Sequence, residues 1–211
     1  MKNKQLKKYR PELHSEIDES FIVNGFHGDF FIQSEFLKLR DKYNIESIIE
    51  TGTFEGNTTK WLARFFQNVY TIEIDIKYVN NAIANCMVYK DKINFLHGDS
   101  SILLPEVLDK INDDNVLIFL DAHRRNENPL EKELVIIEAY KKKFKNIIII
   151  IHDFYVPDTK LGYDTFMDRP LSFDWFKDKF DLIYENNYTY YYNTTDRVTS
   201  INRGIIYLIG K

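Results

Sequence analysis

Short apolar runs alternate with longer stretches of helical spacing along most of this 211-residue chain. The apolar runs are at residues 47–50, 69–74, 93–97, 116–121 and 147–153, and the helical stretches between them are at 58–66, 77–89, 102–111 and 129–142. The fourth and fifth runs are apolar on both faces, which is typical of parallel strands covered by helices on both sides. The pattern therefore predicts a doubly wound α/β sheet with right-handed crossovers.

The last third of the chain departs from this alternation. After a short helix predicted at 172–179, three β-rich segments follow at 182–184, 188–192 and 204–209. Aromatic and β-branched residues are dense in the second of them, as strands prefer. Because no long crossover separates these segments, they predict an antiparallel hairpin at the edge of the sheet.

One domain accounts for most of the chain. A length of 211 residues with 44% hydrophobic side chains suits a single core. Residues 1–33 have little regular spacing, and we interpret them as an N-terminal extension or lid. The domain itself is expected to span residues 34–211 and to open with a helix at 34–40.

Charge and cysteine content bear on partners and compartment. The 28 Lys and Arg residues against 32 Asp and Glu give a net charge of -4, so no nucleic-acid partner is expected. The single cysteine, Cys86, excludes an internal disulfide and fits a reducing compartment. Apolar stretches are too short for a secretory signal or a membrane span, so a cytoplasmic protein with no membrane partner is expected. An aromatic content of 15% leaves room for a homo-oligomer interface.

A glycine-containing turn follows the first apolar run, in the sequence IIETGTFEGNTT at residues 48–59. Gly52 and Gly56 let the backbone bend tightly and approach a ligand closely. A dinucleotide fingerprint starting at Gly52 would need two further glycines, where Phe54 and Asn57 stand instead. No Gly-Lys-Ser or Gly-Lys-Thr of a phosphate-binding loop occurs either. The turn therefore favours a ligand other than a pyrophosphate.

Acidic residues stand at the ends of three successive predicted strands. Glu50 is at the tip of the first, Glu73 ends the second, and Asp99 follows the third. Nucleotide-binding βαβ units carry a ribose-binding acid at the place of Glu73, and ligands of such sheets bind at the carboxyl ends of the strands. Carboxylates there repel phosphate and attract cations. The three acids thus suit a cationic nucleoside with a free ribose diol.

Four motifs in order along the chain, ETGTFEGNTT, YTIE, GDS and LDAH, resemble the successive motifs of class I S-adenosylmethionine-dependent methyltransferases. Residues 203–208 (RGIIYL) resemble the last antiparallel strand of that fold. The glycine loop has the form Gly-x-x-x-Gly in place of Gly-x-Gly-x-Gly and is similar to the branch that contains sugar and macrolide O-methyltransferases. The resemblance implies an α/β, doubly wound, mostly parallel seven-stranded sheet with helices on both faces and a C-terminal antiparallel hairpin, the Rossmann-like methyltransferase fold.

The resemblance also implies S-adenosylmethionine as the cofactor and assigns its parts to residues. Glu50 would lie near the amino group, with Gly52 and Gly56 under the methionine part. Glu73 would hold the ribose hydroxyls, and Asp99 would border the adenine. The predicted cofactor-binding residues are Glu50, Thr51, Gly52, Thr53, Phe54, Gly56, Asn57, Thr58, Glu73, Asp99, Ser100 and Asp121.

Polar residues also follow the fourth and fifth predicted strands, and these are the predicted catalytic residues: Asp121, His123, His152 and Asp153. Methyl transfer to oxygen needs the acceptor proton to be removed or weakened, by a general base or by a divalent cation. In the metal version, Asp121 and Asp153 hold Mg²⁺ or Mn²⁺, with His152 or His123 as a further ligand. In the base version, one histidine accepts the proton and one aspartate orients its ring. Both versions stay open at this point.

The predicted function is therefore an S-adenosylmethionine-dependent methyltransferase that methylates an oxygen of a small-molecule or sugar-containing acceptor. The irregular segment 155–171 is where acceptor recognition is expected. Metal-dependent O-methyltransferases of this fold often have an Asp-Asp pair after the fifth strand, and His152 takes the first position of that pair here. This departure motivates an alternative, a non-catalytic nucleoside-binding or assembly module on the same fold.

Overall fold

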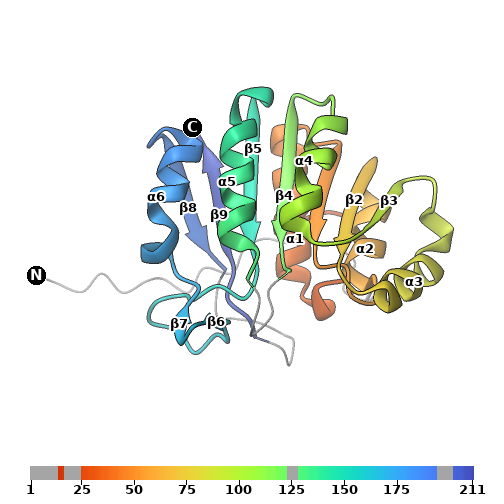
Figure 1. Ribbon diagram of the computed structural model, residues 1–211, viewed down its shortest axis with the longest axis horizontal. Helices are drawn as coiled ribbons and strands as arrows, with labels where there is room; N and C mark the ends of the chain where they lie inside the picture. The colour runs from red at the N-terminus through yellow and green to blue at the C-terminus, as the bar shows by residue number, and fades with distance from the viewer. Residues whose placement is uncertain (1–13, 17–24, 123–127, 194–201) are drawn as a thin grey trace, which may run out of the picture.

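A computed structural model describes residues 14–16, 25–122, 128–193 and 202–211. Seven strands form one sheet in the order β3-β2-β1-β4-β5-β9-β8 (Figure 1). The parallel strands are β1 (Ser47–Thr51), β2 (Asn68–Glu73), β3 (Ile93–His97), β4 (Asn115–Leu120) and β5 (Asn146–Ile151). The antiparallel strands are β9 (Ile206–Gly210), beside β5, and β8 (Tyr188–Tyr192), at the edge. The predicted fold class is confirmed, including the C-terminal hairpin.

Helices cover both faces of the sheet, as Figure 1 shows. One face carries α4 (Ser100–Lys110), α5 (Leu130–Tyr140) and α6 (Phe173–Tyr184), and the other carries α1 (Phe30–Tyr43) and α2 (Asn57–Phe65), with α3 (Ile76–Asn85) beside α2. Strand β4 contributes Ile118 to the first apolar layer and Leu117 to the second, and both side chains are fully buried. Apolar runs on both faces are thus what this sheet requires of its central strands.

Two predicted boundaries differ from the structure. Helix α1 begins at Phe30, four residues before the predicted start, because the Asp29 carboxylate accepts hydrogen bonds from the N–H groups of Phe31 and Ile32 and caps the helix. The β-rich segment predicted at 182–184 is wrong, since these residues end α6. Phe180 and Ile183 lie three apart and are both buried, which is helical spacing.

Short elements complete the described chain. They are the 3-10 turns η1 (Gly25–Gly28), η2 (Met87–Tyr89) and η3 (Lys141–Lys143) and a small hairpin of β6 (Thr165–Phe166) with β7 (Arg169–Pro170). The hairpin lies below the carboxyl ends of the parallel strands in Figure 1. Strand order reverses between β1 and β4, and ligands of doubly wound sheets bind at such a switch point. Among the described residues, no helix combines the length and apolar character needed to cross a membrane.

Candidate active site

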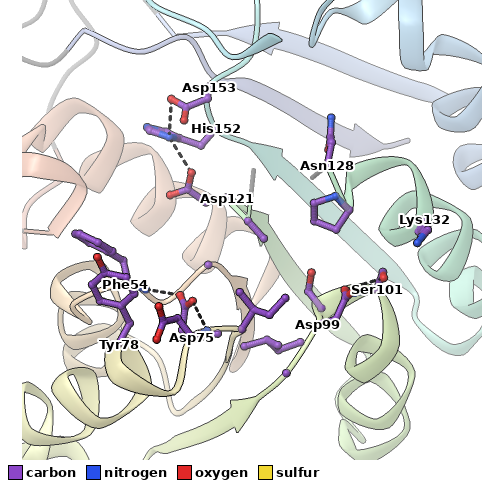
Figure 2. A pocket seen from close by; sticks show the side chains of 18 of the residues that line it. Phe54, Asp75, Tyr78, Asp99, Ser101, Asp121, Asn128, Lys132, His152 and Asp153 are labelled. Atoms are coloured by element: carbon purple, nitrogen blue, oxygen red, sulfur yellow. Dashed lines mark hydrogen bonds and ion pairs between the residues drawn. The ribbon is translucent and has the colours of Figure 1, made fainter. Parts of the chain in front are cut away.

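One cavity of about 1290 Å³ lies at the carboxyl edge of the sheet, at the switch point (Figure 2). Residues from the ends of β1, β2, β3, β4 and β5 line it together. The predicted site residues in its wall are Gly52, Phe54, Glu73, Asp99, Ser100, Asp121, His152 and Asp153. The structure therefore brings the strand-end acids and the polar residues after β4 and β5 into one space.

The glycine turn packs directly against the end of β4. Gly52 has a φ of 87°, and a Cβ atom on it would come within 2.5 Å of the Asp121 carbonyl oxygen. The Asp121 N–H group in turn donates to the Thr51 carbonyl oxygen at 3.0 Å. Phe54 follows in the left-handed region at φ 49°, with its ring 4.4 Å from the Tyr78 ring. Only glycine fits at position 52, because the neighbouring backbone occupies the space of a side chain.

Backbone N–H groups hold the acids at the ends of β2 and β3. Glu73 Oε2 accepts from the Phe54 N–H group at 2.9 Å, and Oε1 accepts from the Asp75 N–H group at 3.0 Å. Asp99 Oδ1 accepts from the N–H group of Ser101 at 2.8 Å and from its hydroxyl at 2.7 Å, which caps α4. Glu73 and Asp99 therefore present carboxylates to the cavity from fixed positions.

Glu50 lies beneath the turn and is not among the residues that line the cavity. Its Oε2 accepts from the Thr59 hydroxyl at 2.5 Å and the Thr71 hydroxyl at 2.7 Å. Burial raises the pKa of Glu50 to about 8, against the opposing effect of the two hydroxyls. Its contact with a cofactor amino group stays a prediction. Five further predicted residues surround the turn without lining the cavity: Thr51, Thr53, Gly56, Asn57 and Thr58.

His152 lies between two carboxylates, as Figure 2 shows. Its Nδ1 is 3.0 Å from Asp121 Oδ1 and 3.1 Å from Asp153 Oδ1. Because ionised carboxylates only accept hydrogen bonds, Nδ1 is the donor and carries the proton. Burial alone would lower the pKa of His152, but Asp121 and Asp153 outweigh it and raise the pKa to about 10. The two carboxylates therefore favour the charged form of His152, and its role as a general base stays a prediction.

Arg203, just before β9, completes this cluster. Its Nε donates to Asp153 Oδ1 and its Nη2 donates to Asp164 Oδ1. Burial would raise the pKa of Asp153, but His152 and Arg203 hold it well below its usual range. Sequence reasoning assigned Arg203 no role in the site, since 50 positions separate it from Asp153 and no local pattern links them.

A divalent cation was one of the two sequence-based versions of the site. The candidate ligand atoms of Asp121, His152 and Asp153 all lie within 4.8 Å of one another, and carboxylate and imidazole ligands suit Mn²⁺. However, the Asp121 and Asp153 oxygens already accept hydrogen bonds from the His152 ring, and Asp153 also accepts from Arg203. A metal ion would have to displace these donors from Asp121 Oδ1 and Asp153 Oδ1, and the metal version stays a prediction. His123, the other candidate base, lies outside the described residues.

The N-terminal segment interpreted as an extension or lid, residues 1–33, adds His27 to the cavity wall, although sequence reasoning gave His27 no role of its own. His27 lines the cavity, and both it and Phe26 have positive φ values, 54° and 53°. The buried Phe26 ring packs against Phe36, Trp61 and Phe119, which fixes the backbone that presents His27. His is among the non-glycine residues enriched in the left-handed region but Phe is not, so this turn has only a weak local sequence signal. The cavity wall also includes Tyr78, Asn128 and Lys132, which sequence reasoning did not assign, and Phe166, which lies in the segment 155–171 where acceptor recognition is expected.

Comparison with known families gives one match. The family model of RNA cap guanine-N2 methyltransferases matches residues 47–122, less than half of the chain. The matched segment runs from β1 to the end of β4 and so contains the glycine turn, Glu73, Asp99 and Asp121. No curated protein matches this chain. Because the matching family acts on RNA, the expectation that nucleic acid is not a partner is not supported.

Solved structures give many matches. An O-methyltransferase from Bacillus cereus in complex with SAH is 23% identical with a TM-score of 0.57, over 85% of this chain and 81% of that one. The methyltransferase domain of bacterial CtHen1 is 11% identical with a TM-score of 0.52, over 82% and 95%. A candidate rRNA methylase from Clostridium thermocellum is 12% identical with a TM-score of 0.50, over 83% and 97%. Identities this low establish the fold and not the substrate.

The fold and the site together define the class of protein. The chain has the class I methyltransferase fold, and its resemblance to class I S-adenosylmethionine-dependent methyltransferases is confirmed by the family match and by the solved structures. Solved neighbours include O-methyltransferases, in agreement with the branch suggested by the glycine loop. They also include enzymes described as RNA methylases, so the acceptor is not fixed by these likenesses.

Proposed function

We propose that this protein is an S-adenosylmethionine-dependent methyltransferase that methylates a hydroxyl oxygen of a small-molecule or sugar-containing acceptor, in a reducing compartment such as the cytoplasm. The observation that carries the proposal is the single cavity that both groups of polar residues line. Its volume of about 1290 Å³ exceeds what one small ligand commonly fills, so a nucleoside cofactor and a small acceptor can share it.

Different residues of the cavity are suited to bind the cofactor and the acceptor. When bound, S-adenosylmethionine supplies an electrophilic methyl group. Glu73 and Asp99, fixed by backbone N–H groups, are positioned to bind its hydroxyls and amino groups. Asp121 lines the cavity with one oxygen on His152, so that its other oxygen can accept a hydrogen bond from the acceptor hydroxyl. That contact orients the hydroxyl for in-line attack and takes up its proton.

RNA is the second candidate acceptor, and the family match favours it. The charge of the cavity argues for a small acceptor instead. Among the lining residues that the structure describes, the positive charges are those of Lys132, Arg203 and the charged form of His152, and the last two are already paired with carboxylates. The acids of the same wall are Glu73, Asp75, Asp99, Asp121, Glu131 and Asp153. Such a wall repels the phosphates that dominate nucleic-acid binding.

Two measurements test the proposal. Calorimetric titration with S-adenosylhomocysteine is expected to give micromolar affinity, and no binding at about 1 mM would remove the proposal. Transfer of tritiated methyl groups is then compared between hydroxylated small molecules and short capped RNA. Asp121→Asn is expected to lower the rate of methyl transfer about 100-fold or more, while S-adenosylhomocysteine still binds. Binding without transfer to either acceptor class would favour the non-catalytic nucleoside-binding module, and transfer to RNA alone would favour the second candidate.

A further inference from the structure

We infer that Arg203 is a built-in cation of the acceptor site: together with the His152 ring, its guanidinium takes the hydrogen-bond positions on Asp153 Oδ1 that a divalent metal ion would use, and the site works without a metal. The role in methyl transfer rests on the proposed function. The occupancy of the site by Arg203 does not, and it can be tested separately.

The guanidinium joins two carboxylates from different segments. Nε donates to Asp153, at the end of β5, and Nη2 donates to Asp164, in the loop that leads to β6. The Asp164 N–H group also donates to the Asp153 carbonyl oxygen at 2.8 Å, so the two acids are linked through the backbone as well. The planar guanidinium offers donors in a fixed fork that suits two carboxylates at once. Arg203 therefore holds the acceptor loop against the sheet.

The backbone around Arg203 is closely fitted, so the position of the guanidinium is set by the fold. The N–H groups of Gly162 and Gly204 donate to Asn202 and Gly162 carbonyl oxygens, each at 2.8 Å, and so pin the chain on both sides of Arg203. A Cβ atom on Gly204 would come within 2.0 Å of the Phe154 carbonyl oxygen, and one on Gly162 within 2.9 Å of Arg203 Nη1. Only 27% of the Arg203 side chain is exposed.

The hydrogen bonds of the cluster leave little place for a metal ion. Asp153 Oδ1 faces both Arg203 Nε and His152 Nδ1, and Asp121 Oδ1 faces His152 Nδ1. Mg²⁺ and Mn²⁺ need oxygen lone pairs in near-octahedral positions, and the two N–H donors take those of Asp153 Oδ1. A divalent ion would also meet the positive charge of Arg203 at short range.

This arrangement has a consequence for the reaction. Because Arg203 neutralises Asp153, Asp121 is the carboxylate of the pair that remains to bind an acceptor hydroxyl. Arg203 itself is a positioning residue, since it acts through Asp153 and Asp164. Chelating agents should then leave methyl transfer unchanged.

The experiment measures Mn²⁺ binding, by calorimetry and by electron paramagnetic resonance, to the full-length protein. Wild type is expected to show no saturable binding up to about 1 mM. Arg203→Met removes the cation and its donors, and it is expected to bind one Mn²⁺ at least tenfold more tightly than wild type. Adding Asp153→Asn to that variant should abolish the gain. Arg169→Met is the matched control, because Arg169 stacks over Trp175 and is not in the cavity wall.

Each outcome decides the inference. Binding of one Mn²⁺ to wild type that Asp153→Asn removes would overturn it, and so would an Arg203→Met variant that folds and gains no Mn²⁺ binding. Arg203→Gln, which keeps an N–H donor without the charge, serves if Arg203→Met does not fold, and it should show an intermediate gain. Titration of the same samples with S-adenosylhomocysteine separates the two claims. If S-adenosylhomocysteine does not bind to the wild type, the proposed function is removed. The Mn²⁺ result still decides the role of Arg203 in that case.

Discussion

The two sides of the cavity are built by different kinds of contact. On the cofactor side, backbone N–H groups fix Glu73 and Asp99, and these donors belong to the turns that follow β1, β2 and β3. On the acceptor side, the contacts run from side chain to side chain, between His152, its two aspartates and Arg203. Backbone donors are present whatever the neighbouring side chains are, whereas a side-chain cluster depends on each of its members.

The family match follows this difference in part. The family match covers residues 47–122, which is the cofactor side and the end of β4. None of His152, Asp153 or Arg203 lies in it. The family match therefore covers the cofactor side and Asp121 of the acceptor side, whereas the solved structures match this chain over 82% and 85% of its length. Three substitutions, taken in order of decreasing effect, test whether the two sides are as separate as this division requires.

The largest effect is expected for Gly52→Ala, on the cofactor side. Alanine would be strained at φ 87°, and its Cβ would meet the Asp121 carbonyl oxygen at 2.5 Å, so the turn or the end of β4 must shift. We expect the free energy of unfolding to fall by about 3 kcal/mol and the affinity for S-adenosylhomocysteine to fall about 100-fold. Denaturant titration and calorimetry measure the two effects. Gly210→Ala is the control, because its nearest contact is the Tyr184 ring at 3.3 Å.

Part of this division is visible in the sequence and part is not. The two-sided apolar runs at 116–121 and 147–153 predict β4 and β5 closely, because burial on both faces leaves a local pattern. The glycine turn and Glu73 also leave a local pattern, because the βαβ unit fixes their spacing in the sequence. The link between Arg203 and Asp153 depends on chain segments 50 positions apart, and no periodicity encodes such a pair. At residues 182–184 a local pattern was present but misleading. Their β-rich composition predicts a strand, whereas they end α6 because that helix packs on the core.

The second substitution is His152→Asn, on the acceptor side. The amide keeps an N–H donor near the position of Nδ1 but removes the positive charge between Asp121 and Asp153. We expect a loss of about 2 kcal/mol in the free energy of unfolding at pH 6, measured by denaturant titration, because Asp121 then has no cationic partner and no cation lies between the two carboxylates. Affinity for S-adenosylhomocysteine should change less than about fivefold. A loss as large as that of Gly52→Ala would show that the two sides are one unit.

The pH dependence of this loss identifies its cause. The pKa of His152 is raised from its ordinary value of 6.5 to about 10 in the folded protein. The stabilisation is therefore complete below about pH 6.5 and disappears as the pH rises through 10. The difference between wild type and His152→Asn should shrink over that range. A difference that stays constant from pH 6 to pH 10 would attribute the loss to packing instead of charge.

The smallest effect on ligand affinity is expected for Glu50→Gln. Burial raises the pKa of Glu50 from 4.5 to about 8, so without ligand its carboxyl group is mostly protonated at pH 7 and an amide is close to it in shape and charge. The amide oxygen can accept from the Thr59 and Thr71 hydroxyls as Oε2 does. We expect affinity for S-adenosylhomocysteine within about threefold of wild type at pH 7.

Stability should respond to pH in the same variant. Because the folded pKa of Glu50 is raised, its contribution is present below about pH 4.5 and is lost as the pH rises through 8. Glutamine does not titrate, so Glu50→Gln should become more stable than wild type by several kcal/mol at pH 9, with exposed Glu46→Gln as the control showing no such gain. A tenfold loss of affinity would mean that Glu50 reaches the cofactor's amino group after all. Glu50 would then bind the ligand directly as well as stabilise the glycine turn above it.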